Sequence, residues 1–171
     1  IVLAEGEDIR TVEAAATVLA EGYAKIIMLG NADKIKAMAA EKGVDISGAE
    51  IIDPETSAKT ADYADKFYEM RKAKGMTPEK AAETMKNVLY YGVMMVEKDL
   101  ADGMVAGAVN STANVLRPSL QILKTAPGTK LVSAFFLMVV PDCEYGENGI
   151  FVFADSGLCE NPDADAVSEI A

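Results

Sequence analysis

Apolar and polar positions follow each other in blocks whose period changes in a regular order. Short apolar runs occupy residues 1–5, 25–30 and 49–54. Continuous apolar runs are typical of parallel strands buried on both faces. Between these runs, apolar residues recur every three to four positions, which is the helical period. The order strand, helix, strand, helix, strand predicts an α/β fold: a parallel-rich sheet with right-handed crossovers and helices on both faces.

Residues that favour helix ends support this division. Gly22 and Gly43 follow the two predicted helices, and Asn31 precedes the second one. Glycine is favoured just after a helix and asparagine just before it. A longer helical tract follows, with one helix predicted from Ser57 to Lys74. Thr77 and Pro78 then predict the N-cap and first position of a helix or helix pair that runs to about residue 98.

The remaining pattern predicts a second folding unit. A strand at residues 102–109 and a helix at 113–124 are followed by the break Pro127–Gly128. From Lys130 the pattern restarts, with two strands, "KLVSAFFLMVV" and "GIFVFAD", joined by a turn-rich segment. A last helix is predicted to have Asn161 as its cap and Pro162 at its first position. We therefore expect most of a first α/β domain in residues 1–129 and the truncated start of a second in 130–171.

Composition narrows the classes of function. The 27 acidic residues outnumber the 16 basic ones, for a net charge of −11, which argues against binding to nucleic acid or to anionic lipid. The longest apolar run, residues 131–140, is too short to span a bilayer. Without any histidine, this chain alone cannot form a Ser-His-Asp or Cys-His site. Two cysteines suggest neither a metal site nor a disulfide framework, and free thiols in a reducing compartment are expected.

The segment "GAVNSTANVLRPSLQILKTAPGTK" is the strongest candidate site. Gly107, Asn110, Ser111 and Thr112 come after a predicted strand and before a helix, where open α/β sheets bind ligands. Free amides at a helix start favour an anion, and Arg117 could add a charged contact. These features predict a phosphate or carboxylate ligand. The alternative is that the small residues only form the turn.

Three further positions admit two interpretations each. Arg71 ends a predicted helix, where a positive charge also simply suits the helix dipole. Cys143 lies in a loop, but its neighbours Asp142 and Glu144 should disfavour the thiolate that a nucleophile requires. Asp155 follows a strand, so it could be a catalytic carboxylate or could cap the next turn.

The motifs together resemble the phosphate acetyltransferase (phosphotransacetylase) family. The similarity runs through "IVLAEGEDIRT", "RKAKGMTPEKA", "DGMVAGAVNSTANVLRPSLQILKTAPGTK", "VPDCEYGENGIFVFADSG" and "NPDADAVSEIA", in matching order and spacing. The run Leu-Arg-Pro-x-Leu-Gln-Ile followed by Lys-Thr-x-Pro-Gly is the most specific of these. The phosphate butyryltransferases are the next most similar group.

The resemblance implies a reversible transfer of an acetyl group between coenzyme A and phosphate through a ternary complex. It implies that acetyl-CoA is a substrate, with no permanently bound cofactor and no metal. It also implies two α/β domains, in the architecture of isocitrate and isopropylmalate dehydrogenases, with a cleft between them. Family members are typically cytoplasmic homodimers. The catalytic aspartate of the family lies in its C-terminal part, so we expect it outside this chain.

The resemblance also assigns individual residues. By motif, Arg71 and Arg117 match arginines that bind the phosphates of coenzyme A. Thr112 matches a hydroxyl position of the cleft, with Ser111 and Asn110 beside it as further substrate-binding residues. Cys143 matches a cysteine near the site that is not the nucleophile. The sequence departs from many relatives, which have His in place of Asn110, Asp in place of Asn114 and Cys in place of Ser156.

Two alternatives remain open at this level. One is a different acyl specificity, such as butyryl. The other is that these residues form an inactive fragment or a module that binds coenzyme A without chemistry. The sequence does not separate these readings, because the acyl pocket and the catalytic aspartate are not identified in it.

Overall fold

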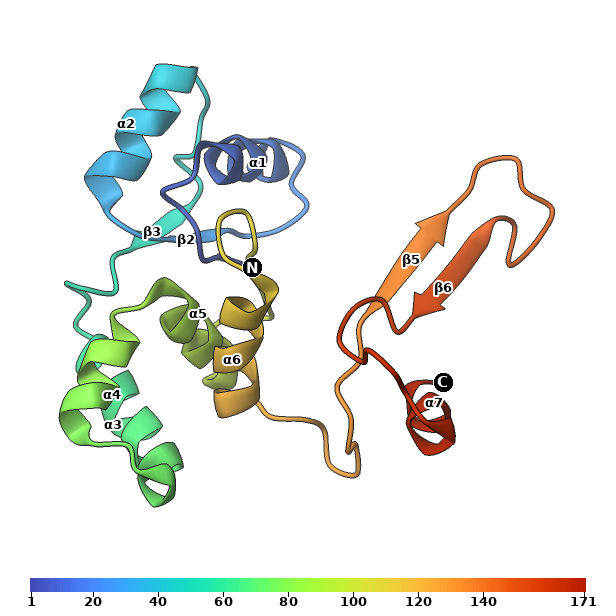
Figure 1. The fold of residues 1–171 in the computed structure, drawn as a ribbon. Helices are drawn as coiled ribbons and strands as arrows, with labels where there is room; N and C mark the ends of the chain where they lie inside the picture. The colour runs from blue at the N-terminus through green and yellow to red at the C-terminus, as the bar shows by residue number, and fades with distance from the viewer. The chain divides into compact units, whose positions relative to one another are not determined.

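The computed structural model describes all residues from 1 to 171, and they form two compact units, residues 1–124 and 125–171 (Figure 1). Each unit has its own sheet. None of the helices combines the length and the apolar character needed to cross a bilayer. The two units are described separately.

The first unit is built on a parallel four-stranded sheet, as the sequence pattern predicts. Its strands are β1 (Val2–Leu3), β2 (Ile27–Leu29), β3 (Glu50–Ile52) and β4 (Met104–Val105). Their order is β3-β2-β1-β4, and every neighbouring pair is parallel. The strands are shorter than the apolar runs that predict them, because the ends of those runs lie outside the paired ladder.

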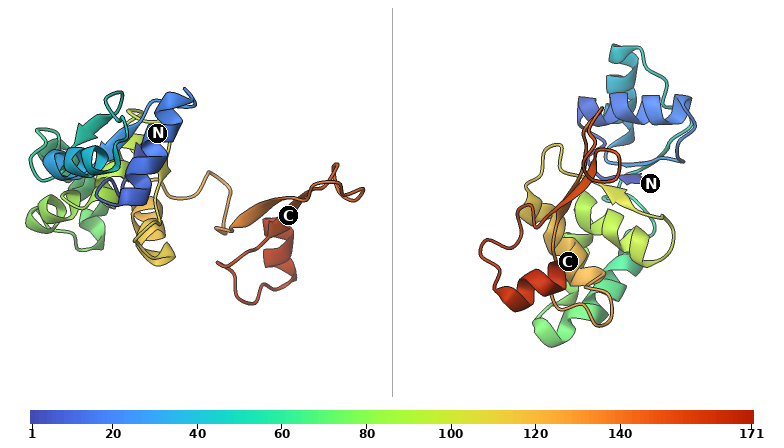
Figure 2. Two further views of the ribbon diagram at one scale, coloured as in Figure 1. Left: turned by 90° about the horizontal axis from the view of Figure 1, so that it is seen from above. Right: turned by 90° about the vertical axis from the view of Figure 1, so that its right-hand side faces the viewer.

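Helices cover both faces of this sheet. One layer consists of α1 (Ile9–Ala20) and α2 (Ala32–Lys42). The other contains α3 (Thr60–Arg71), α4 (Pro78–Met85), α5 (Val88–Glu97) and α6 (Thr112–Ile122). The right-hand view of Figure 2 shows the two groups on opposite sides of the sheet.

Alternation along the strands gives each layer its own core. Met28 packs with α1 and α2, where Val12 and Ile35 are fully buried. Leu29, the next residue, points to the opposite face and packs with Phe67 and other buried residues of the second layer. Successive strand residues point to opposite faces, so a continuous apolar run is what a sheet covered on both sides requires.

Most predicted helix ends are confirmed. Asn31 accepts hydrogen bonds from two amides of the first turn of α2, and Gly43 ends that helix with φ of 66°. Thr77 caps α4, whose first residue is Pro78. The prediction of a single helix for residues 57–74 is wrong. α3 begins at Thr60 and ends at Arg71, and a short 3₁₀ turn, Lys72–Lys74, follows it. Residues 53–57 instead form a turn, closed by the Ser57 amide bonding to the Asp53 carbonyl at 2.9 Å.

The second unit contains the antiparallel hairpin of β5 (Phe135–Val139) and β6 (Ile150–Ala154), followed by α7 (Ala164–Ile170). The two strands are therefore confirmed. The predicted cap Asn161 and first position Pro162 are wrong. Asp163 caps α7 instead, accepting a hydrogen bond from the Ala166 amide at 2.8 Å. An aspartate caps as well as an asparagine, and the cap nearer to the helical residues prevails.

The hairpin is apolar on both faces, and both faces are exposed. Phe136 and Phe153 are directly opposite each other and are 58% and 55% exposed. The sequence predicts cover on both faces of the first strand, and within the second unit that cover is absent. The large apolar side chains exposed on the two strands are Phe135, Phe136, Leu137, Met138, Val139, Ile150, Val152 and Phe153.

We predict that the 171-residue chain binds a dye that fluoresces on apolar surfaces. Replacing the Phe136–Phe153 pair by threonines should lower this fluorescence measurably, because threonine keeps the β-propensity but not the apolar area. Tyr23→Ser is the matched control, since Tyr23 is 75% exposed on the first unit and should not contribute. Fluorescence at the level of free dye with the unmodified chain would contradict the exposure of the hairpin.

Candidate functional site

The sheet order creates a switch point between β1 and β4. From β1 the chain proceeds outward to β2 and β3, whereas β4 pairs with the other side of β1. In open α/β sheets, ligands bind outside the carboxyl ends of the strands at such a point. Here the end of β1 leads to Glu5, and the end of β4 leads to the segment Gly107–Asn110, which we call the β4–α6 loop.

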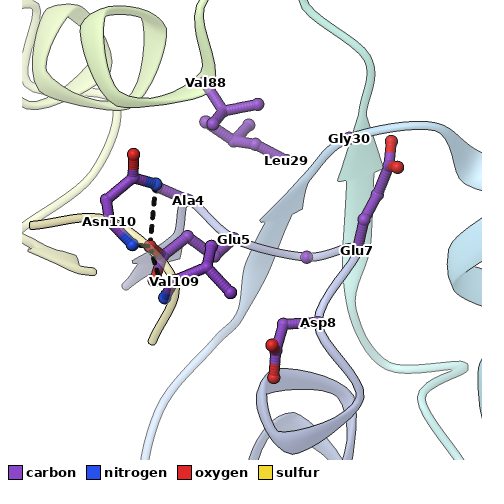
Figure 3. Close-up of a pocket in the computed structure, with 10 residues that line it drawn as sticks. Ala4, Glu5, Glu7, Asp8, Leu29, Gly30, Val88, Val109 and Asn110 are labelled. Carbon is purple, nitrogen blue, oxygen red and sulfur yellow. Dashed lines mark hydrogen bonds between the residues drawn. The ribbon is translucent and has the colours of Figure 1, made fainter. Parts of the chain in front are cut away.

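Glu5 joins these two strand ends. It is the one buried charged residue of the chain, with 6% of its surface exposed. One carboxylate oxygen accepts hydrogen bonds from the amides of Gly107 and Ala108 at 2.8 and 2.6 Å. The other accepts from the amides of Val109 and Asn110 at 3.1 and 2.8 Å, and from the Asn110 side-chain nitrogen at 2.8 Å. Figure 3 shows Asn110 folded against the Glu5 carboxylate.

These hydrogen bonds keep Glu5 ionised. Burial alone raises the pKa of its carboxyl group, but the bonds from the Asn110 side chain and from the loop amides outweigh burial and lower the pKa from 4.5 to about 2. A lowered pKa stabilises the fold at pH values above about 4.5, and this contribution is lost as the pH falls toward 2. The shift corresponds to a free energy on the order of 3 kcal/mol.

The sequence predicts free amides at the start of the helix, and the amides of the preceding β4–α6 loop are not free. The amides of residues 107–110 are occupied, because a carboxylate of the chain itself lies where an external anion was expected. At the start of α6, Ser111 Oγ accepts from the Asn114 amide at 3.3 Å. The amides of Thr112 and Ala113 donate no hydrogen bond within the chain. The first turn of α6 therefore has the free amides that the sequence predicts at a helix start.

Arg10 holds the β4–α6 loop from a second side. Its Nη2 donates to the carbonyl of Ala108 at 2.6 Å. Asp8 fixes the guanidinium through bonds of 2.9 Å to Nε and Nη2, and Asp8 is itself the N-cap of α1. The segment between β1 and α1 thus binds both the amides and a carbonyl of the loop.

The two arginines singled out from the sequence lie on different helices around one tyrosine. Tyr90 of α5 donates a hydrogen bond to Gln121 of α6 at 3.1 Å and packs edge-on against Phe67 of α3, with 5.5 Å between the ring centres. Arg71 comes one helical turn after Phe67, and Arg117 comes one turn before Gln121. Burial raises the pKa of the Tyr90 hydroxyl, while the charges of Arg117 and Arg71 oppose that rise.

Neither of these arginines has an acidic partner. The chain has three arginines, and only Arg10 pairs with a carboxylate. The Nε of Arg71 is buried and makes no hydrogen bond. In a chain of net charge −11, two arginines without carboxylate partners suit an external anion, because guanidinium groups bind phosphate or carboxylate in a fixed geometry.

The second unit contains the other two candidates. Asp155 accepts hydrogen bonds from the amides of Gly157, Leu158 and Ala134 at 2.6, 2.7 and 3.0 Å. The bonds from Gly157 and Leu158 hold the pKa of its carboxyl group well below the usual range. Of the two readings of Asp155, the structure favours the cap of a turn. Cys143 lies in the loop that joins β5 to β6, and its side chain is half-buried. Cys143 and Cys159 are both free thiols, as expected.

A cavity of about 220 Å³ lies beside Glu5 at the ends of β1 and β2. Ligand pockets usually measure about 300–1,000 Å³, so this one suits only a small group. The two other carboxylates that line the cavity already have hydrogen-bond partners. Glu7 accepts from the Asn31 amide and from Lys34, and Asp8 accepts from Arg10. No group of three acidic, cysteine or histidine side chains is arranged to hold a metal ion.

Sequence reasoning missed the residues that organise this site. Glu5 lies in the motif "IVLAEGEDIRT" and Gln121 in the run Leu-Arg-Pro-x-Leu-Gln-Ile, but the sequence analysis assigned a role to neither, and Tyr90 lies outside the motifs. Glu5 had a signal, because it is an acidic residue directly after an apolar strand that should be central in a parallel sheet. Tyr90 and Gln121 had none, since their meeting depends on how α5 packs against α6.

Comparison with known proteins covers the whole chain. The family model described as phosphate acetyl/butaryl transferase matches residues 1–171. The phosphate acetyltransferase of Acetivibrio thermocellus is 62% identical over 171 residues, and that of Clostridium acetobutylicum is 51% identical over the same length. All of this chain is covered in both comparisons, but it spans only about half the length (51%) of each of these relatives.

Solved structures give the same result. The EutD phosphotransacetylase from Staphylococcus aureus superposes with a TM-score of 0.87 at 38% identity, covering 98% of this chain and 49% of that one. A phosphotransacetylase from Streptococcus pyogenes gives a TM-score of 0.87 at 39% identity, covering 99% of this chain and 50% of that one. With a family model that matches every residue, the chain belongs to the phosphate acetyl/butaryl transferase family.

Proposed function

We propose that these residues form the coenzyme A-binding part of an enzyme that transfers an acetyl group reversibly between coenzyme A and inorganic phosphate. The observation that carries the proposal is the pair Arg71 and Arg117, which lie on two helices around Tyr90 without any carboxylate partner. Relatives described as phosphate acetyltransferases, up to 62% identical, support the reaction. Acetyl-CoA, phosphate and acetyl phosphate are then substrates, and no permanently bound cofactor is needed.

The charges of the chain suit this ligand. Coenzyme A carries several phosphate groups, and a strongly acidic protein repels it except where positive charge is concentrated and unpaired. A ligand phosphate would supply the partner that the buried Nε of Arg71 lacks. Ser111 and Thr112, at the start of the helix that bears Arg117, add hydroxyl groups and amides that favour an anion. Asn110 lies beside them, held by Glu5.

For the chemical step we propose direct transfer within a ternary complex. An aspartate takes the proton of the coenzyme A thiol, and the thiolate attacks the carbonyl of acetyl phosphate; the C–O bond to phosphate breaks, giving acetyl-CoA and inorganic phosphate. We place this aspartate outside residues 1–171. The most prominent acidic groups here are poor bases, because hydrogen bonds lower the pKa of Glu5 to about 2 and also that of Asp155.

For the whole protein we propose two α/β domains in the architecture of isocitrate and isopropylmalate dehydrogenases, with residues 1–129 in the first and 130–171 beginning the second. The exposed apolar faces of the β5–β6 hairpin support a second domain that is larger than these residues. We also propose a cytoplasmic homodimer. Acetyl rather than butyryl specificity is favoured by the names of the relatives at 62% and 51% identity.

We predict that Arg71→Ala and Arg117→Ala, made in the full-length protein, each raise the KM for coenzyme A. Losing a charged hydrogen bond costs roughly 1.5–3 kcal/mol, which corresponds to about a ten- to hundredfold rise in KM. Steady-state kinetics with varied coenzyme A at saturating acetyl phosphate gives the value.

The matched control is Lys72→Ala, which removes the same charge from the residue after Arg71. Lys72 already pairs with Glu69, so its loss should change KM little. A KM for coenzyme A within twofold of the unmodified protein in both arginine variants would show that neither binds this substrate.

We further predict that Cys143→Ser retains most of the activity and that no acyl-enzyme accumulates. Direct transfer requires no covalent intermediate, and Cys143 is flanked by the acidic residues Asp142 and Glu144. Mass spectrometry of the protein quenched during turnover provides the measurement. An acetyl group found on Cys143 would overturn the ternary-complex mechanism.

A further inference from the structure

We propose that Glu5 is the positioning residue of the site: its carboxylate fixes the path of the β4–α6 loop and so sets where Asn110, Ser111 and the first turn of α6 meet the ligand. The consequence for ligand binding rests on the proposed function, whereas the anchoring of the loop does not. Glu5 touches no reacting atom in this role. It acts through the amides that it holds.

The hydrogen bonds of Glu5 use the whole carboxylate. Each oxygen accepts two consecutive backbone amides, and Asn110 Nδ2 adds a further bond. A carboxylate offers about four lone-pair sites, so little capacity is left for a proton, a metal ion or a ligand. The group is therefore committed to the loop and is not available as a base.

The β4–α6 loop has little else to hold it. Val105 and Val109 are 61% and 65% exposed, so their side chains do not anchor the segment in a core. Gly107 adopts φ of 117°, where residues with a side chain are strained. The contacts that fix the loop are polar ones, from Glu5 and from Arg10 to the carbonyl of Ala108.

The anchor itself is rigid. Glu5 follows Val2 and Ala4, both fully buried, on a strand that is paired on both sides. Rigid, fully packed elements hold functional groups more accurately than loops do. Ser111, the N-cap of α6, follows Asn110 directly. Any shift of residue 110 is therefore passed to the cap, to Thr112 and to the helix that carries Arg117.

Only an ionised acceptor fits this position. Glutamine has nearly the same shape, but one of its two terminal atoms is an NH₂ donor that would face amide donors. Glu5→Gln should therefore release at least two of the amides and leave them without a partner inside the protein. Aspartate keeps the charge but is one methylene shorter, so Glu5→Asp should restore the contact in part.

The first measurement is amide hydrogen exchange, followed by NMR in the full chain. In Glu5→Gln, the amides of residues 107–110 should exchange at least about tenfold faster, the factor that 1.4 kcal/mol of lost protection produces. Glu7→Gln is the matched control. Glu7 is also a carboxylate at this edge, but it holds the Asn31 amide and Lys34, so its loss should leave residues 107–110 unchanged.

A second variant keeps the proposal testable if Glu5→Gln does not fold. Asn110→Ala removes only the side-chain bond and leaves the four backbone bonds, so exchange at residues 107–110 should rise roughly two- to tenfold. Unchanged exchange at these amides in a folded Glu5→Gln protein, or in Asn110→Ala when Glu5→Gln is unfolded, overturns the anchoring role.

Kinetics in the full-length protein separates this proposal from the proposed function. Glu5→Gln should raise the KM for coenzyme A by a larger factor than it lowers kcat, and Glu5→Asp should recover part of the loss. Raised exchange without any change in KM, while Arg71→Ala does raise KM, would overturn the positioning role and leave the proposed function standing. If neither Glu5→Gln nor Arg71→Ala changes the KM for coenzyme A, the proposed function is wrong. Faster exchange at residues 107–110 would then support only the anchoring of the loop.

Discussion

One buried carboxylate holds together the ends of β1 and β4, where the candidate site of this molecule lies. Glu5 lies two residues after β1, an inner strand of the parallel sheet, and binds the backbone of residues 107–110, which are about a hundred positions away in the sequence. Burying a charge is costly unless it is fully hydrogen-bonded, and Glu5 meets that condition through backbone amides. The same contact thus stabilises the sheet edge, fixes the start of α6 and occupies the amides that would otherwise attract an external anion.

The arginine pair depends on a different kind of constraint. Arg71 and Arg117 lie near each other because α3, α5 and α6 pack in one layer, and Tyr90 contacts both outer helices through Phe67 and Gln121. Of the three arginines, only Arg10 pairs with a carboxylate, that of Asp8. The buried Nε of Arg71 has no hydrogen-bond partner within the chain, and in the proposed function a ligand phosphate would supply one.

The sequence predicts the local elements of the first unit because their signals are local. Asn31, Gly43 and Thr77–Pro78 mark helix ends through the backbone of their own turns, and the continuous apolar runs require a sheet covered on both faces. The occupied amides of the β4–α6 loop could not be predicted in this way, because their acceptor is a residue distant in sequence. Asn161 and Asp163 compete as caps within three positions, and the pattern alone did not separate them. The binding role of Arg71 and Arg117 was inferred from the family resemblance. The position of Tyr90 near both arginines could not be, because it depends on how the helices pack.

The most direct measurement of this account is the pKa of Glu5 itself, taken from the pH dependence of its carboxyl ¹³C chemical shift in the folded chain. If the carboxylate is held by the amides of residues 107–110, the shift should titrate with a midpoint near 2. The amide protons of those residues should move with the same midpoint. A carboxyl group that titrates at or above 4.5, the ordinary pKa of a glutamate, would show that Glu5 does not anchor the loop.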